Sequence, residues 1–233
     1  MKIKKSVVLL SLIMLVSLFF MSSVFASPLA ETYWFTNLGI GGASTIDSEL
    51  DHMGYNGHIY CDTSATYVRR TMDDDAVFAY VGHGLPGILN CNSSDYYLSA
   101  YNITSDTYNR SLQYAFANTS DKLSSIRFAY YGACYSNVYS STYGRLTSYT
   151  TSNLDALAAM GFNDSIYNSV ATYFEKRLFI YLDNGNTISA SREYAAQDSI
   201  SQFGLSTWNN SQVDTCSITG NQYVKLEPAA YGN

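Results

Sequence analysis

Two apolar runs in this chain stop at the same kind of turn. Residues 76–82 lead directly into His83 and Gly84, and the largely apolar residues 126–133 lead into Cys134. Runs of this length that end at turn residues are typical of strands buried on both faces of a sheet. Each run therefore predicts a buried strand that presents a reactive side chain at its carboxyl end.

The rest of the pattern predicts strands and helices in alternation. Further strands are expected at residues 32–38, 58–61, 154–162 and 222–226. Helices are expected at residues 44–53, 64–72, 108–116 and 187–200, and polar loops at 85–107 and 135–152. One more helix is expected between Asp164, its N-cap, and Gly185, its end. Its apolar residues recur every three or four positions: Ile166, Val170, Phe174, Leu178 and Tyr181.

Strands separated by helices imply parallel β-α-β units with helices on both faces of the sheet. In such sheets the working site lies at the carboxyl ends of the strands. If the strands that precede His83 and Cys134 are neighbours, the two side chains emerge at one edge and within reach of each other. We therefore predict an α/β domain whose thiol and imidazole support acyl transfer, as in a cysteine peptidase.

The first 26 residues have the pattern of a secretion signal. A lysine-rich start precedes an apolar stretch at residues 7–21 and a small-x-small cleavage site that ends at Ala26. The apolar stretch is short for a membrane span. We expect an exported, secreted protein with no membrane partner after signal removal, and a single domain at residues 27–233.

The net charge limits the possible partners, and the number of cysteines limits the possible disulfides. The formal net charge of −6 argues against nucleic acid or an anionic membrane surface as a partner. If Cys134 is a nucleophile, Cys61, Cys91 and Cys216 remain, and at most one intramolecular disulfide can form among them. That these three are simply small buried thiols is the alternative.

An apolar strand before His83-Gly84, followed by an apolar strand before Ala133-Cys134, resembles the caspase-like (clan CD) cysteine peptidases. The group includes the caspases and legumains as well as the bacterial clostripain and gingipains. Residues 158–162 are similar to the strand that follows the nucleophile in bacterial members, and the likeness covers residues 32–228. It implies a caspase-like α/β/α sandwich with a mostly parallel central sheet.

The resemblance also implies roles for individual residues. Cys134 would attack the scissile carbonyl as a thiolate, and His83 would protonate the leaving amine and then activate water. The backbone N–H groups of Gly84 and Cys134 would form the oxyanion hole. Protein or peptide substrates are implied, and no organic cofactor.

The sequence pattern supports the other candidate bases and metal ligands less well than it supports His83. His52 falls in a predicted helix and His58 starts a short strand, so both are expected to be structural or surface residues. The histidines and cysteines lack metal-binding spacing, so no metal is expected. The acidic run at residues 73–75 could hold calcium, which some members of the resembling family bind. It has no EF-hand pattern, and such runs are usually solvated.

Substrate specificity has no clear signal. Clan members that cut after arginine or lysine place an acid in the primary pocket, in several cases two residues before the nucleophile. Gly132 holds that place here, and Val81 holds the corresponding place before His83, so neither supplies a charge. Four acids could reach the pocket from neighbouring loops, with no basis for a choice: Asp47, Asp62, Asp155 and Asp164.

A second class of function stays open beside the peptidase. The same fold with an inactive site could serve as a binding or regulatory module that engages a partner through loops 91–109 and 135–152, which are rich in Tyr, Ser and Asn. A third possibility is transpeptidation or self-processing through the same thioester. The reactivity of Cys134 separates the first two, and intact mass after incubation reveals the third.

Overall fold

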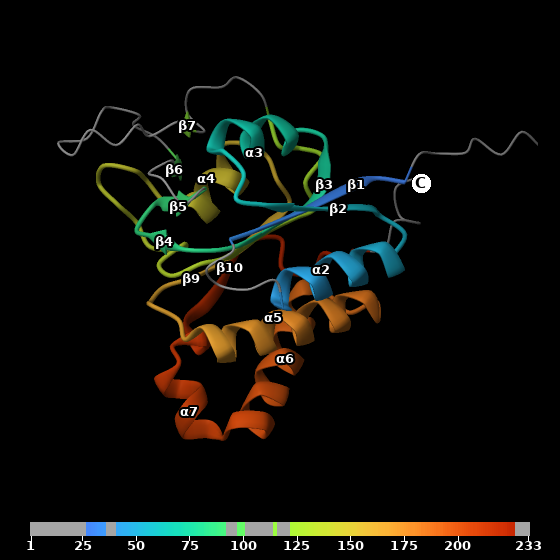
Figure 1. The fold of residues 1–233 in the computed structure, drawn as a ribbon, viewed down its shortest axis with the longest axis vertical. Coiled ribbons are helices and arrows are strands. Elements are labelled where there is room, and N and C mark those ends of the chain that lie inside the picture. Colours follow the sequence, from blue (N-terminus) through green and yellow to red (C-terminus); the bar gives the residue numbers. More distant parts are fainter. Residues whose placement is uncertain (1–26, 36–40, 92–96, 101–113, 116–121, 227–233) are drawn as a thin grey trace, which may run out of the picture.

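The computed structural model describes residues 27–35, 41–91, 97–100, 114–115 and 122–226. A six-stranded sheet runs through its centre in the order β10-β9-β8-β3-β1-β2 (Figure 1). All neighbouring strands are parallel except β10, which pairs antiparallel with β9. The strands are β1 Leu29–Trp34, β2 Asn56–Cys61, β3 Asp75–Val81, β8 Phe128–Gly132, β9 Ala158–Phe162 and β10 Cys216–Gly220. The predicted mostly parallel α/β sheet is confirmed.

Helices cover both faces of this sheet (Figure 1). One face carries α2 Gly41–His52, α5 Asn168–Asp183 and α6 Ile188–Phe203. The other face carries α3 Ala65–Thr71 and α4 Leu146–Ser152. The short α7 Leu205–Asn210 and a 3-10 turn at Val213–Thr215 follow α6 and lead to β10.

The two apolar cores explain why β3 has an unbroken apolar run from Ala76 to Val81. Val77, Ala79 and Val81 pack on the α2–α5 face, whereas Phe78 and Tyr80 pack on the α3–α4 face. All seven residues of β3 and all five of β8 are buried. A strand with both faces covered needs apolar residues at successive positions, and this is the pattern that predicted both strands.

The predicted polar loop at residues 85–107 is wrong in part, because the structure has a small second sheet there. Its strands are β4 Gly84–Leu85, β5 Ile88–Asn90, β6 Tyr97–Ser99 and β7 Tyr114–Ala115. Pro86 and Gly87 form the hairpin turn between β4 and β5, and Gly87 has the positive φ of +76° that a type II turn requires. The helix predicted at 108–116 is a strand at 114–115, and its other residues lie outside the described part.

Three further boundaries differ from the prediction. The last part of the predicted loop 135–152 is a helix, α4, which covers Leu146–Ser152. Asp164 does not cap α5, because the N-cap of that helix is Tyr167. The Oδ1 atom of Asp164 instead accepts a hydrogen bond from the N–H of Ser165 at 2.7 Å. The final strand is β10 rather than residues 222–226, because the carbonyls of Gln222 and Val224 accept hydrogen bonds from the first turn of α6. Residues 222–226 therefore cap a helix and do not join the sheet.

Most remaining boundaries agree closely with expectation, but β9 begins at Ala158 and covers only the second half of the strand expected at residues 154–162. β1 starts at Leu29, a few residues before the predicted strand, and residues 36–38 of that strand lie outside the described part. Gly54 and Gly185 follow α2 and α5 with φ values of +91° and +75°. The expected secretion signal at residues 1–26 also lies outside the described residues. No helix among those described is long and apolar enough to cross a membrane.

Candidate active site

The strands that precede His83 and Cys134 are neighbours. β3 pairs in parallel with β8, and the register places Val81 opposite Gly132, so both strands end at the same edge of the sheet. His83 and Cys134 line one pocket of about 320 Å³ at this edge, together with the start of α5. His83 is exposed and Cys134 is half-buried, which leaves both accessible from solvent.

The segment after β3, which carries His83, packs at Gly84 against the segment after β8, which carries Cys134. A Cβ atom on Gly84 would lie 2.5 Å from the backbone oxygen of Cys134 and 2.9 Å from the Cβ of Ala133. Only glycine allows this approach. The His83 carbonyl is held by the Asn90 N–H at 3.1 Å and the Tyr80 hydroxyl at 2.9 Å. Since hydrogen-bonded pairs alternate along an antiparallel ladder, the N–H of Gly84 points away from β5.

The turn that carries Cys134 is held in a strained conformation. Tyr135, the next residue, has φ of +56°, a value that non-glycine residues rarely adopt. Its N–H donates to the Asp164 carbonyl at 3.0 Å. The buried Ser136 hydroxyl donates to the Tyr131 carbonyl at 2.8 Å and accepts the Phe162 N–H at 3.0 Å. Contacts with the ends of β8 and β9 thus hold the turn that carries Cys134 in place.

The sulfur of Cys134 faces the segment that leads into α5. The backbone N–H of Ile166 donates to Sγ at 3.4 Å, and the Ser165 hydroxyl lies 3.8 Å from it. These contacts hold the sulfur beside Ser165 and Ile166, which also line the pocket. His83 also lines a second pocket of about 230 Å³, together with Gly84, Leu85, Ile88 and Asn90.

The sequence analysis missed the buried acid of the first pocket, Glu175. It projects from α5, is 2 % exposed, and lines the pocket with His83 and Cys134. The Tyr130 hydroxyl donates to its Oε1 at 3.1 Å. Burial raises the pKa of Glu175 to about 8, although the Tyr130 hydrogen bond and the nearby Lys176 act in the opposite direction. A charged residue on an otherwise apolar helix face was the sequence signal that could have found it.

The four acids that sequence analysis left open do not line this pocket. Asp155 lies beside Lys122 at 3.3 Å, and Asp47 lies on α2. Asp62 follows β2, and the backbone carbonyl of Asp164 accepts a hydrogen bond from Tyr135, next to Cys134. The acid nearest the predicted nucleophile pocket thus comes from a helix and not from a loop.

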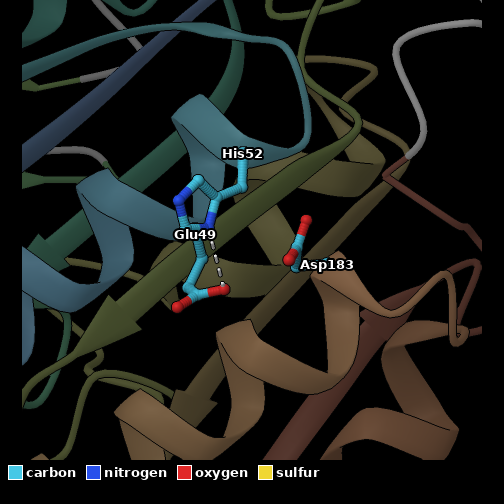
Figure 2. Close-up of side chains that lie close together, drawn as sticks. All are labelled: Glu49, His52 and Asp183. Carbon is cyan, nitrogen blue, oxygen red and sulfur yellow. Dashed lines mark ion pairs between the residues drawn. The ribbon is translucent and has the colours of Figure 1, made fainter.

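The rival histidines lie elsewhere. The ring of His58 on β2 lies 3.2 Å from the Asn56 amide. His52 ends α2, 3.8 Å from Glu49, and Asp183 at the end of α5 faces both (Figure 2). One ligand atom from each of these three side chains lies within 4.8 Å of the others, so they could hold a divalent cation. Neither histidine lines the pocket of Cys134.

The acidic run at residues 73–75 is divided among different partners. Asp73 forms an ion pair with Arg69 on α3. Asp75 is fully buried, where desolvation and the neighbouring Glu31 raise its pKa to about 9. Asp74 borders a separate surface pocket beside Arg70. A single calcium site formed by all three carboxylates does not fit this arrangement.

The four cysteines are separate free thiols. Cys61 is exposed, and Cys91 and Cys216 are buried. Burial raises the pKa of Cys91 to about 12 and also raises that of Cys216. Cys134 is therefore the cysteine that is accessible to solvent and also shares a pocket with a histidine, His83.

Comparison with solved structures identifies the fold. The chain superposes on the crystal structure of the Arg-specific cysteine proteinase gingipain R (RgpB) with a TM-score of 0.59 and 13 % sequence identity, covering 86 % of this chain and 48 % of that one. The chain has the caspase-like gingipain fold. It also matches the complex of the Porphyromonas gingivalis RgpB pro- and mature domains, with a TM-score of 0.64, 9 % identity and 87 % and 49 % coverage.

The gingipain likeness is one of fold. The chain spans about half the length of these gingipain structures. No family model and no curated protein matches its sequence. The gingipain fold is the caspase-like fold of the clan CD cysteine proteinases, so the predicted fold is confirmed.

Proposed function

We propose that this protein is a secreted cysteine endopeptidase that uses Cys134 as nucleophile and His83 as general acid and base. The observation that carries the proposal is the convergence of the two side chains on one pocket, at the carboxyl ends of adjacent parallel strands. The gingipain fold supports it, because the proteins that share it here are named cysteine proteinases. The expected secretion signal supports an extracellular site of action.

The first half of the reaction forms a thioester. The Cys134 thiol gives its proton to His83, and Sγ attacks the scissile carbonyl carbon. The resulting oxyanion accepts hydrogen bonds from the N–H groups of Gly84 and Cys134, and donors of this kind contribute about 3 kcal/mol each. The C–N bond then breaks, and His83 passes the proton to the leaving amine.

The second half releases the acid product. His83 takes a proton from a water molecule, whose oxygen attacks the thioester carbon. The C–S bond breaks, and the proton held by His83 returns to the sulfur. The two pockets that His83 lines would accommodate the substrate on the two sides of the scissile bond.

Covalent labelling tests the nucleophile directly. A peptidyl chloromethyl ketone alkylates the active-site sulfur with loss of chloride, so one inhibitor mass should be added per chain and map to Cys134. Cys61 is the internal control, because it is exposed but lies outside the pocket. His83→Ala should slow the labelling of Cys134 and leave that of Cys61 unchanged. Equal labelling of Cys61 and Cys134 would contradict the proposal and favour the binding module.

A further inference from the structure

Two buried carboxyl groups lie at the end of the sheet that is remote from Cys134. Asp75 is the first residue of β3, whereas His83 follows the end of that strand. Asp75 is 0 % exposed, and Glu31 on the neighbouring strand β1 is 4 % exposed. Acidic side chains are almost never buried to this degree unless they are paired. The Glu31–Asp75 pair therefore calls for a reason that the proposed peptidase reaction does not supply.

The contacts of this pair leave its oxygens short of donors. The Tyr33 hydroxyl donates a hydrogen bond to Oε2 of Glu31. Neither carboxyl oxygen of Asp75 accepts a hydrogen bond from a described residue. Asp75 instead meets a second carboxyl group, because burial and then the charge of Glu31 raise its pKa to about 9. Two buried carboxyl groups placed in this way do not both ionise unless a cation joins them.

A surface pocket gives solvent access to the pair. It has a volume of about 320 Å³, and its lining residues are Leu29, Glu31, Tyr67, Arg70, Thr71 and Asp74. The Thr71 hydroxyl lies 2.6 Å from the hydroxyl of Tyr33, so further oxygen atoms lie beside Glu31. Asp74 and Arg70 are exposed, and water therefore screens the charge of both. The pocket is wide enough for an ion that keeps some of its water ligands.

We infer that Glu31 and Asp75 together bind a hard divalent cation, Ca²⁺ or Mg²⁺, through the pocket that Glu31 lines. The groups available here are carboxylate and hydroxyl oxygens, which are the ligands that these ions prefer. The bound ion would join β1 to β3 at the start of β3 and stabilise the fold. It would lie at the opposite end of β3 from His83, so the inference does not rest on the proposed peptidase function.

A second group of described side chains competes for the same kind of ion. It consists of Glu49, His52 and Asp183 at the ends of α2 and α5 (Figure 2). An imidazole nitrogen suits zinc better than it suits a hard cation. His52 is also exposed, whereas the carboxyl oxygens of Asp75 are buried and lack donors. These differences favour the Glu31–Asp75 pair, and the experiment must separate the two groups.

Calorimetry on the full protein tests the inference. The Cys134→Ala protein, which cannot digest itself, is freed of metal with EDTA, dialysed and titrated with CaCl₂ or MgCl₂ at pH 7.5. We expect one ion per chain, and the tighter of the two titrations identifies the preferred ion. Glu31→Gln and Asp75→Asn should each weaken binding at least about 30-fold, because each removes one charged ligand. Glu193→Gln, an exposed glutamate on α6, is the matched control, and Glu49→Gln tests the competing group. Neither should change the affinity.

Thermal unfolding at pH 8.5 gives a second readout, which a purely structural role of the acids would not reproduce. In EDTA, Asp75→Asn should be more stable than the protein with Asp75, because the buried charge is gone. The double variant Glu31→Gln/Asp75→Asn should also be folded. The preferred ion should raise the midpoint of the protein with both acids by several degrees and leave both variants unchanged.

Three results would overturn the inference. The folded protein could bind neither ion, it could bind with an affinity that Glu31→Gln and Asp75→Asn leave unchanged, or it could lose binding in Glu49→Gln instead. The last result would assign the ion to the group at the ends of α2 and α5. None of these results bears on peptide cleavage by Cys134, which is tested separately.

Discussion

The burial of Glu175 predicts a specific dependence of stability on pH. The pKa of Glu175 is about 8 in the folded protein against an ordinary value of 4.5. Between these values the folded protein holds a proton that the unfolded chain has lost. Stability from this group is thus fully present below pH 4.5 and is lost as pH rises to 8. One unit of pKa difference corresponds to about 1.36 kcal/mol, so the shift from 4.5 to about 8 amounts to about 5 kcal/mol.

Glu175→Gln removes the titration and keeps the shape of the side chain. Urea unfolding of both proteins at pH 4.0 and 8.5 gives the comparison, since every other titrating group cancels in the difference. The variant should match the wild type at pH 4.0 and exceed its free energy of unfolding by several kcal/mol at pH 8.5. Glu193→Gln should show no such difference. Parallel pH profiles of wild type and Glu175→Gln would refute the buried, proton-holding carboxyl group.

Three more perturbations probe the site and the sheet. Gly84→Ala places a Cβ against the Cys134 backbone oxygen, so kcat/KM should fall at least about 100-fold while thermal unfolding shows that the fold persists. Ser136→Ala leaves the buried Phe162 N–H without its acceptor and should cost about 1–3 kcal/mol of stability in urea unfolding. Asp75, whose pKa is raised to about 9 by burial and Glu31, destabilises the fold as pH rises toward that value. Asp75→Asn should therefore be more stable than the wild type at pH 8.5 and not at pH 4, as measured by the same urea unfolding.

The strands next to the candidate site could be predicted because local pattern and tertiary environment agree there. β3 and β8 are covered on both faces, so burial appears in the sequence as an unbroken apolar run. Their carboxyl ends could then be assigned to one edge of a parallel sheet. The meeting of His83 and Cys134 at one pocket follows from that placement alone.

The features that sequence analysis missed depend on contacts between distant segments. Residues 222–226 alternate like a strand, yet their carbonyls cap α6, which lies about 30 residues earlier in the chain. Glu175 fits the helical period of α5, so period alone could not show that it projects into the pocket of Cys134. Only the packing of α5 and α2 against β8 brings Glu175 between Gly42 and Gly132.

The central claim is that Cys134 and His83 together cleave peptide bonds. The most direct test is hydrolysis of a fluorogenic peptide panel, varied at the residue before the scissile bond, in the presence of reductant. Wild type, Cys134→Ala, His83→Ala and the control Cys61→Ala are compared, with circular dichroism to establish that each is folded. The account predicts thiol-dependent cleavage that falls at least about 1,000-fold in the first two variants and is unchanged in Cys61→Ala. Cleavage that persists in folded Cys134→Ala, or no cleavage by the folded wild type anywhere in the panel, would contradict it.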